Sequence, residues 1–364
     1  MINRQGIYYW KCDRPSAFHS LSKPASSSGY LEMEISVKAL LSRIFGASSC
    51  SFRKAGGQGN HITYLVENRG LTYFLRMEDG PEEDSYMEIE AKVLDLVRDS
   101  GVPTPIVYAV DATRREYPFS YQLMQFIDYP DLNSLYKKEP FEINQLGVQI
   151  GYHIALWQKI QPEGFGFFDP QKLSENSFLA GLHSTYRDYF LLNWERHLDF
   201  LIERQFIDGK VYGEIKALVH AYDGRLDLPQ GVMVHKDLAL WNILGTRSAV
   251  KSYIDWDDAI SGDPTDDISL LACFHSGAFI THVLEGYQQV RELPEDFTSR
   301  FWLHLLRNMI VKAVIRVGAG YFDLNHDFFL IGTGDTGESL KHFTRERIQK
   351  ACLGLQNKLA IQDL

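Results

Sequence analysis

The chain has 364 residues, 45% of them hydrophobic and 13% aromatic, which supports a sizeable packed core and excludes global disorder. Its length favours about two domains or lobes. The formal net charge of −10 argues against nonspecific binding to nucleic acid or to an anionic membrane surface, and it permits a cationic substrate.

Three features of the sequence bear on its compartment. The first five residues lead into no apolar segment, so a secretory signal peptide is not expected. The longest uncharged stretch, residues 268–284, is interrupted by Gly277 and is slightly short for a membrane span, which favours a buried helix. The cysteines form no CxxC pair, and their scatter is typical of reduced thiols in the cytoplasm; they are Cys12, Cys50, Cys273 and Cys352.

The first third of the chain predicts an extension followed by a small sheet with a helix in it. Residues 1–30 form the expected extension, which ends in a Ser- and Pro-rich stretch. Apolar residues at three- and four-residue steps predict a helix over 31–45, and a second helix is predicted over 87–98, before Gly101. β-branched and aromatic runs predict strands at residues 62–66, 71–76, 104–110 and 120–127.

From about residue 144 onward, the pattern predicts a mainly helical part of the chain. Two short apolar runs, residues 232–234 and 252–254, interrupt it as expected strands. The expected helices span residues 145–160, 186–203, 210–221, 300–317 and 340–359, with helical sequence also resuming at residue 268. The organisation is therefore a β-rich N-terminal part and a helical C-terminal part.

The segment from residue 234 to 244 carries the strongest chemical signal. It contains the pattern H-x-D-L-x-x-x-N, with His235, Asp237 and Asn242 at fixed positions, and Asp255 follows within Ile-Asp-Trp-Asp. Phosphoryl transfer needs one carboxylate at the attacking hydroxyl, then an amide and a second carboxylate at the metal. The order predicts Asp237 as the proton acceptor and Asn242 and Asp255 as ligands of Mg²⁺ on the phosphates of ATP.

These motifs resemble those of the aminoglycoside phosphotransferase and choline kinase-like family, small-molecule relatives of the protein kinases. The family segments H-G-D-L-x-x-x-N, I-D-W/F-E/D and G-D-P-x-x-D-L-A correspond to segments that begin at His235, Ile254 and Gly262. The resemblance covers residues 45–320, nearly the whole chain, and implies that Asp267 braces the catalytic loop.

The fold that the resemblance implies is α+β and bilobal, like that of the protein kinases. A small β-rich N-lobe would span residues 31–128 and bind the nucleotide, and a larger, mainly helical C-lobe would span residues 129–364 and carry the catalytic loop and the substrate site. The implied cofactors are ATP and Mg²⁺. The implied activity is an ATP-dependent O-phosphotransferase, a kinase that transfers the γ-phosphoryl group to a hydroxyl of a small molecule.

A glycine-rich loop precedes the second expected strand and is a candidate phosphate cradle. It consists of Gly56, Gly57, Gln58, Gly59 and Asn60. Glycines can equally serve turn geometry between two strands, and the loop lacks both the G-K-[ST] ending of a P-loop and the third glycine of a dinucleotide fingerprint. Its place upstream of Arg76 favours the phosphate-binding interpretation.

The remaining nucleotide contacts follow from the resemblance. Arg76 stands where the family carries its phosphate-binding Lys or Arg, with a solvated strand-end arginine as the alternative. Its expected partner is Glu90, with Glu88 as the competitor, because Glu90 shares a helix face with apolar residues. Adenine would bond to the carbonyl of Gln125 and the N–H of Ile127 in a hinge strand between the lobes.

Several residues depart from the family pattern or leave a choice open. Lys236 replaces the usual glycine, and it could stabilise the transferred phosphate as a catalytic residue or be solvated. His235 is expected to orient the catalytic loop rather than act as the base, and Trp157 is expected to pack. Asp257 could reach a second metal or the substrate; Asp258, Asp263 and Asp266 could be solvated loop carboxylates.

Two functions remain open at the level of sequence. The first is an active small-molecule kinase, because Asp237, Asn242 and Asp255 are all present. The second is a nucleotide-binding pseudokinase or regulatory module, supported only by Arg76 and Lys236 at positions that usually differ. The acceptor could be an aminoglycoside, a macrolide, an amino alcohol, a sugar or another metabolite. Its expected lining residues are Phe274, His275, Trp302, Arg307, Tyr321 and Phe322.

Overall fold

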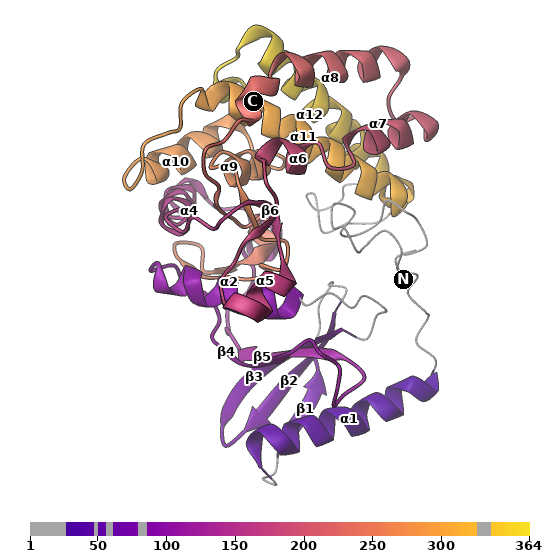
Figure 1. Cartoon of the computed structure of the whole chain (residues 1–364), viewed down its shortest axis with the longest axis vertical. Coiled ribbons are helices and arrows are strands. Elements are labelled where there is room, and N and C mark those ends of the chain that lie inside the picture. The colour runs from indigo at the N-terminus through magenta and orange to yellow at the C-terminus, as the bar shows by residue number, and fades with distance from the viewer. Residues whose placement is uncertain (1–26, 47–49, 56–60, 79–85, 326–335) are drawn as a thin grey trace.

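The computed structural model describes residues 27–46, 50–55, 61–78, 86–325 and 336–364. Most of the expected N-terminal extension and the glycine-rich loop 56–60 lie outside these ranges. A β-sheet with one long helix occupies the lower part of Figure 1, and the C-terminal helices fill the upper part. This arrangement confirms the α+β class, with a β-rich N-terminal part and a helical C-terminal part.

The N-terminal sheet has five antiparallel strands in the order β1-β2-β3-β5-β4. They are β1 (Ser51–Lys54), β2 (Ile62–Asn68), β3 (Leu71–Glu78), β4 (Val107–Asp111) and β5 (Ser120–Gln125). At the centre Leu75 pairs with Tyr64 on one side and Leu123 on the other. These three side chains are buried against helix α1 (Ser27–Phe45), so the sheet needs α1 to cover its apolar face.

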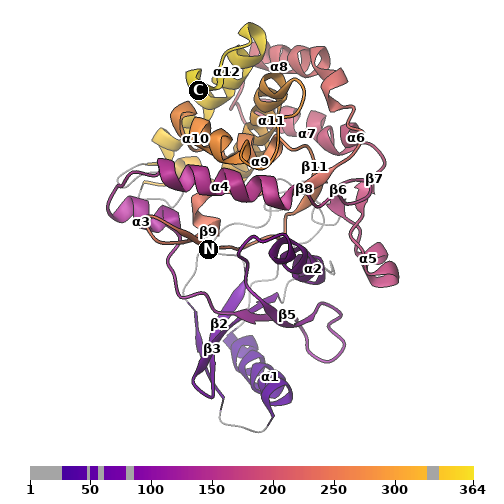
Figure 2. The same cartoon turned by 90° about the vertical axis from the view of Figure 1, so that its left-hand side faces the viewer.

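Helix α2 (Tyr86–Asp99) lies between the sheet and the helical part of the molecule, as Figure 2 shows. Its buried face includes Ile89 and Val93, which join the core of the C-terminal part. Glu90 lies on that inward side and is 1% exposed. The helix stops before Gly101, whose φ of +91° is the left-handed conformation that glycine adopts readily, as predicted.

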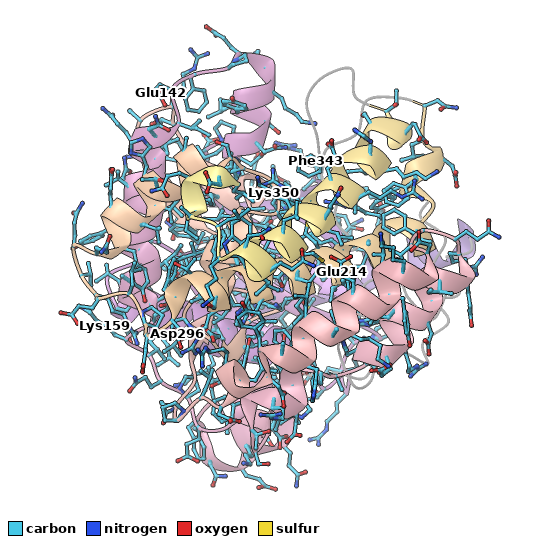
Figure 3. All side chains as sticks on the ribbon, turned by 90° about the horizontal axis from the view of Figure 1, so that it is seen from above. Glu142, Lys159, Glu214, Asp296, Phe343 and Lys350 are labelled. Atoms are coloured by element: carbon cyan, nitrogen blue, oxygen red, sulfur yellow. The ribbon has the colours of Figure 1, made fainter. Side chains whose placement is uncertain are left out.

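The C-terminal part contains α3 (Leu132–Lys138), α4 (Asn144–Trp157), α5 (Pro170–Asn176), α6 (Tyr186–Phe190), α7 (Trp194–Glu203), α8 (Gly209–Ala221), α9 (Asp266–Leu271), α10 (Gly277–Tyr287), α11 (Phe297–Gly318) and α12 (Gly337–Asn357). Viewed from above in Figure 3, α12 lies beside α8, and Gln356 Nε2 donates to Glu214 Oε1 at 2.6 Å. None of the helices among the described residues is long and apolar enough to cross a membrane.

Two expected helices are each divided in the structure. The helix predicted over 186–203 is broken by Asn193, which has a left-handed φ of +56°. The stretch 268–284, predicted as one buried helix, forms α9 and α10, with extended Ser276 as the N-cap of α10. Hydrophobic periodicity continues through both breaks, which is why the sequence pattern did not reveal them.

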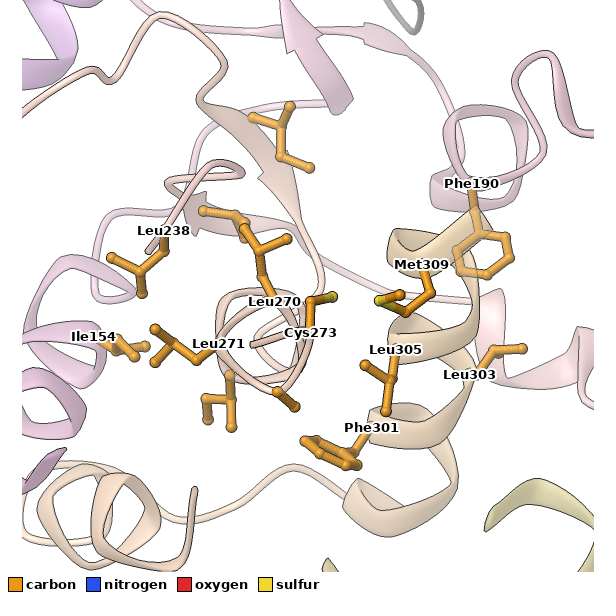
Figure 4. Close-up of a cluster of buried hydrophobic side chains, with 14 of the residues drawn as sticks. Ile154, Phe190, Leu238, Leu270, Leu271, Cys273, Phe301, Leu303, Leu305 and Met309 are labelled. Carbon is orange, nitrogen blue, oxygen red and sulfur yellow. The ribbon is translucent and has the colours of Figure 1, made fainter. Parts of the chain in front are cut away.

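The core of the helical part is built around α9. Figure 4 shows Leu270 and Leu271 of α9 between Ile154 of α4 and the α11 side chains, which include Leu305 and Met309. All five side chains are at most 2% exposed. This packing fixes α9 relative to the two longer helices, and α9 begins with carboxylates that bind the predicted catalytic loop.

Short strands position the chemical segments. A four-stranded sheet has the order β7-β6-β11-β8, and β9 pairs with β10 as a separate hairpin. Their bounds are β6 (Phe165–Phe168), β7 (Gly181–His183), β8 (Val232–Val234), β9 (Ile243–Gly245), β10 (Val250–Tyr253) and β11 (Ile260–Gly262). The predicted catalytic motif therefore connects β8 to β9, and Asp255 lies between β10 and β11, so both loops start from buried strands.

Candidate active site

A cavity of about 630 Å³ lies between the N-terminal sheet, α2 and the helical part. Its walls bring together seven predicted site residues: Arg76, Glu90, Gln125, Ile127, Asp237, Asn242 and Asp255. Two others, His235 and Lys236, are not among the lining residues. The predicted phosphate loop, residues 56–60, lies outside the described residues.

Asp237 and Asn242 meet within the loop that follows β8. Asn242 Nδ2 donates to the backbone carbonyl of Asp237 at 2.8 Å and to its Oδ2 at 3.0 Å. Burial raises the pKa of Asp237 to about 7, while nearby Lys312 opposes that rise. A carboxylate with a pKa near neutrality is well matched to accepting a proton at physiological pH.

His235 ties the catalytic loop to the segment that carries Asp255. Its Nε2 lies 3.0 Å from the carbonyl of Ile254, and its Nδ1 accepts from the backbone N–H of Asp237 at 3.3 Å. Burial lowers the pKa of His235 to about 4, so the ring is neutral and Nε2 carries the proton. These contacts suit an orienting residue, whereas a base would need to reach the cavity.

Lys236 adopts a left-handed φ of +68°, which explains why glycine is usual at this position in the family. Its Nζ donates to both carboxylate oxygens of Asp266, at 3.1 and 2.9 Å, and to Asn308 Oδ1 at 2.7 Å. The solvated alternative is wrong, because the side chain is only 9% exposed. The ammonium is directed at these two partners rather than into the cavity.

Asp267 braces the predicted catalytic loop from the start of α9. Its carboxylate accepts from the backbone N–H groups of His235 at 3.0 Å and Lys236 at 3.1 Å. Trp157 also donates its indole N–H to Asp267 at 3.1 Å, so it does more than pack as predicted. Two of these donors belong to the loop and the third belongs to α4, so this buried carboxylate ties the loop to α4.

The prediction that Asp263 and Asp266 are solvated is wrong. Both are at most 1% exposed, and Asp263 Oδ2 accepts from Arg300 Nε at 2.9 Å and Nη2 at 2.6 Å. Buried carboxylates need such partners, because an unpaired charge in the protein interior is costly. These two aspartates are therefore structural supports of the site.

Arg76 links the sheet to the metal segment. It forms an ion pair with Glu90, and its Nη1 donates to Asp255 Oδ1 at 3.2 Å. At 6% exposure it is buried, so the solvated strand-end alternative is wrong. The competitor Glu88 instead accepts from the backbone N–H of Ala112 at 3.2 Å. Glu90 also accepts from the backbone N–H of Trp256 at 2.9 Å.

Asn242 and Asp255 line the same cavity and offer the oxygen ligands of a metal site. The backbone N–H of Ile254 donates to the carbonyl of Asn242 at 3.0 Å, which holds the two segments together. Burial raises the pKa of Asp255, Asp257 adds to the rise, and Arg76 opposes it. A divalent cation would satisfy this concentration of carboxylates, and carboxylate and amide oxygens are the ligands that Mg²⁺ takes.

The part of the cavity lined by α11 contains two cations that the sequence motifs did not predict. Lys312 Nζ lies 3.9 Å from Asp237 Oδ1 and 4.8 Å from the centre of the Phe274 ring. Arg316 also lines this end. Asn308, Lys312 and Arg316 recur at four-residue steps on α11, so polar residues on one stripe of a buried helix were the available signal.

The predicted acceptor-lining residues are only partly correct. Phe274 and Tyr321 line the cavity, whereas the other four predicted residues are not among its walls. Trp302 is fully buried and donates to the carbonyl of Leu359 at 2.9 Å. Arg307 is buried too, with Nε donating to the carbonyl of Phe190 at 2.9 Å. Both side chains stabilise the helical core instead.

A family model described as the phosphotransferase enzyme family matches residues 53–301, which is more than half of the chain. The chain belongs to this family. The match includes the predicted catalytic motif, the metal segment and both buried aspartates of α9. A search of curated proteins finds no match.

Solved structures of other proteins resemble this phosphotransferase over most of its length. A thermostable mutant of aminoglycoside phosphotransferase APH(4)-Ia, in a ternary complex with ADP and hygromycin B, is 16% identical with a TM-score of 0.60, covering 86% of this chain and 98% of that one. A putative fructosamine-3-kinase from Thermobifida fusca is 20% identical with a TM-score of 0.60 and the same coverage.

A third structure, a putative aminoglycoside phosphotransferase from Ralstonia eutropha, is 17% identical with a TM-score of 0.56; the match covers 89% of this chain and 97% of that one. At these identities the likeness concerns the fold. It confirms the bilobal, protein kinase-like fold that the sequence motifs implied.

Proposed function

We propose that the protein is an ATP-dependent kinase that transfers the γ-phosphoryl group of ATP to a hydroxyl of a small molecule. The observation that carries this proposal is the meeting of Asp237, Asn242 and Asp255 at one cavity in a member of the phosphotransferase enzyme family. Phosphoryl transfer depends mainly on positioning and charge stabilisation, and these residue types supply both.

Asp237 accepts the proton of the attacking hydroxyl in this proposal. Its position in the cavity and its pKa of about 7 suit that task. His235 and Asp267 act through the backbone of the loop, since they hold Asp237 in place without lining the cavity. Lys236 is not assigned to the chemistry, because its ammonium is bound by Asp266 and Asn308.

The nucleotide is proposed to bind between the hinge and Asp255. The carbonyl of Gln125 and the N–H of Ile127 would bond adenine, since both residues line the cavity beside the apolar side chains of Leu94 and Met124. Arg76, held by Glu90, would bind phosphate, and residues 56–60 would cover it. Asn242 and Asp255 would hold Mg²⁺, which when bound neutralises phosphate charge.

The acceptor is proposed to enter at the α11 end of the cavity, next to Asp237. The neighbours favour a small molecule, since one is a complex with hygromycin B and others are putative fructosamine-3-kinases. The negative net charge permitted a cationic acceptor, but Lys312 and Arg316 line this end and favour a neutral or anionic hydroxyl compound. Cytoplasmic location, and the lack of nucleic-acid and membrane partners, stay predictions.

A screen for acceptor-dependent ADP release tests the proposal. Purified protein with ATP and Mg²⁺ would be incubated with aminoglycosides, macrolides, amino alcohols, sugars and hydroxy acids. We expect ADP release with at least one compound, matched by a gain of one phosphoryl group in its mass. Mg²⁺-dependent ATP binding with no turnover across the panel would instead support the alternative, a nucleotide-binding pseudokinase or regulatory module.

A further inference from the structure

His61 brings a nitrogen donor to the metal segment, a feature outside the proposed function. One ligand atom each from His61, Asp255 and Asp257 lies within 4.8 Å of the other two. His61 Nε2 lies 4.0 Å from Asp257 Oδ2. The His61 and Asp257 side chains are only 13% and 12% exposed, so the three groups share a largely enclosed space.

A carboxylate lies beside the other nitrogen of the imidazole. His61 Nδ1 lies 3.0 Å from Glu78 Oε1, and the Glu78 side chain is 15% exposed. Histidine ligands in metalloproteins typically hold their second nitrogen against a carboxylate, which fixes the tautomer and the direction of the ring. Nδ1 makes no hydrogen bond to any described residue in this arrangement. Glu78 would therefore brace the ring once it turns to present the Nε2 lone pair to an ion held by the aspartates.

The aspartates come from the segment after β10. Asp255 has a left-handed φ of +64°. Arg76 donates to its Oδ1, which leaves Oδ2 as the oxygen that would coordinate a metal ion. Asp257 is 9% exposed. If both residues bind one ion with bonds of about 2.0–2.2 Å, the 4.0 Å between His61 Nε2 and Asp257 Oδ2 must shorten by roughly 1 Å. Small side-chain rotations would be enough.

We propose that His61, Asp255 and Asp257 form a binding site for a first-row transition-metal ion such as Mn²⁺ or Zn²⁺, with Glu78 as the brace of His61. Mg²⁺ prefers a shell made of oxygen, whereas imidazole nitrogen suits transition metals. The ion would bind without nucleotide or acceptor, so the site can exist whether or not the proposed kinase activity does.

Electron paramagnetic resonance of Mn²⁺ bound to the nucleotide-free protein tests the site. We expect stoichiometric binding and an electron spin echo modulation from a directly bound ¹⁴N nucleus. His61→Gln should abolish the nitrogen modulation and weaken Mn²⁺ binding by at least tenfold. Glu78→Gln should keep the modulation and weaken binding about 10–100-fold, because it removes only the brace.

His220→Gln is the matched control, because His220 is an exposed residue of α8 far from the cavity lining. It should leave both binding and modulation unchanged. Three results would overturn the proposal: Mn²⁺ bound to the wild-type protein without nitrogen modulation, a Mn²⁺ affinity of His61→Gln equal to that of the wild type, or no binding of Mn²⁺ and Zn²⁺. The role of His61 would then be limited to its contacts with Asp257 and Glu78. ADP release is measured separately, so either proposal can fail alone.

Discussion

The cation nearest the proposed base comes from a helix distant in sequence. Lys236 adjoins Asp237 in the chain, yet its ammonium binds Asp266, while Lys312 of α11 reaches the Asp237 carboxylate. Motif spacing predicts which residues share a loop, but it carries no information on which helix packs over that loop. The motif therefore could not predict Lys312, and it wrongly suggested Lys236 as the cation near the transferred phosphate.

Lys312 should set the pH dependence of the reaction. Lys312→Met removes a positive charge that lowers the pKa of Asp237, so that pKa should rise above about 7. Asp237 accepts protons only when ionised, and activity is lost as pH falls through its pKa. The acidic limb of kcat/KM should thus move to higher pH by about 1 unit. An unmoved limb would contradict this; Lys312→Arg, which keeps the charge, is the control.

Lys236 should contribute to stability rather than to chemistry. Lys236→Gly relieves the left-handed backbone, worth about 1 kcal/mol, but leaves the buried Asp266 without its cation, which costs about 3–5 kcal/mol. We expect a net loss of about 2–4 kcal/mol in the free energy of unfolding by denaturant titration. Adding Asp266→Asn should recover part of that loss. A variant as stable as the wild type would refute the buried pair.

At the scale of elements, α4 and α10 approach each other through a reciprocal pair of glycines. A Cβ added to Gly151 would lie 1.8 Å from the carbonyl oxygen of Val283, and one added to Gly286 would lie 1.8 Å from that of Val148. The contacts are with backbone atoms, which cannot rotate away. This close packing positions α4, whose Trp157 holds Asp267.

Alanine substitutions separate close packing from helix propensity. Gly151→Ala should destabilise the protein by about 1–3 kcal/mol or more, because the helices must move apart. Gly213→Ala is the control: Gly213 is exposed in α8, and an added Cβ would meet nothing within 4 Å. It should stabilise by about 0.5–1 kcal/mol through better helix propensity. Thermal unfolding of both variants checks this, and equal shifts would rule out the packing account.

At the scale of the whole molecule, the ion pair of Arg76 with Glu90 joins sheet and helix to the C-terminal part. Glu90 accepts from Trp256, and Arg76 donates to Asp255, so both halves meet at the metal segment. The α+β class, the order of a β-rich part before a helical part, and most strands and helices could be predicted from the sequence. These features depend on apolar periodicity and motif order, which can be read from neighbouring residues along the chain. The helix breaks at Asn193 and Ser276 leave the apolar spacing uninterrupted, so periodicity does not report them.

The site was predictable to the extent that the motif names its members. Seven predicted residues line one cavity, whereas Trp302 and Arg307, which are predicted to line the acceptor site, are buried in the core. Large aromatic and cationic side chains on a helix give no sign of which stripe faces a cavity. The lobe boundary at residue 128 stays a prediction, as does the phosphate-binding loop.

The most direct measurement compares Asp237→Asn with the wild type in two assays: single-turnover phosphoryl transfer to an acceptor found in the screen, and titration of nucleotide with Mg²⁺. The amide keeps the shape of the side chain and loses the proton acceptor. We predict a rate lower by about 10²–10⁴-fold, with nucleotide affinity within a few-fold of wild type. A transfer rate equal to that of the wild type would contradict the assignment of Asp237 as the base.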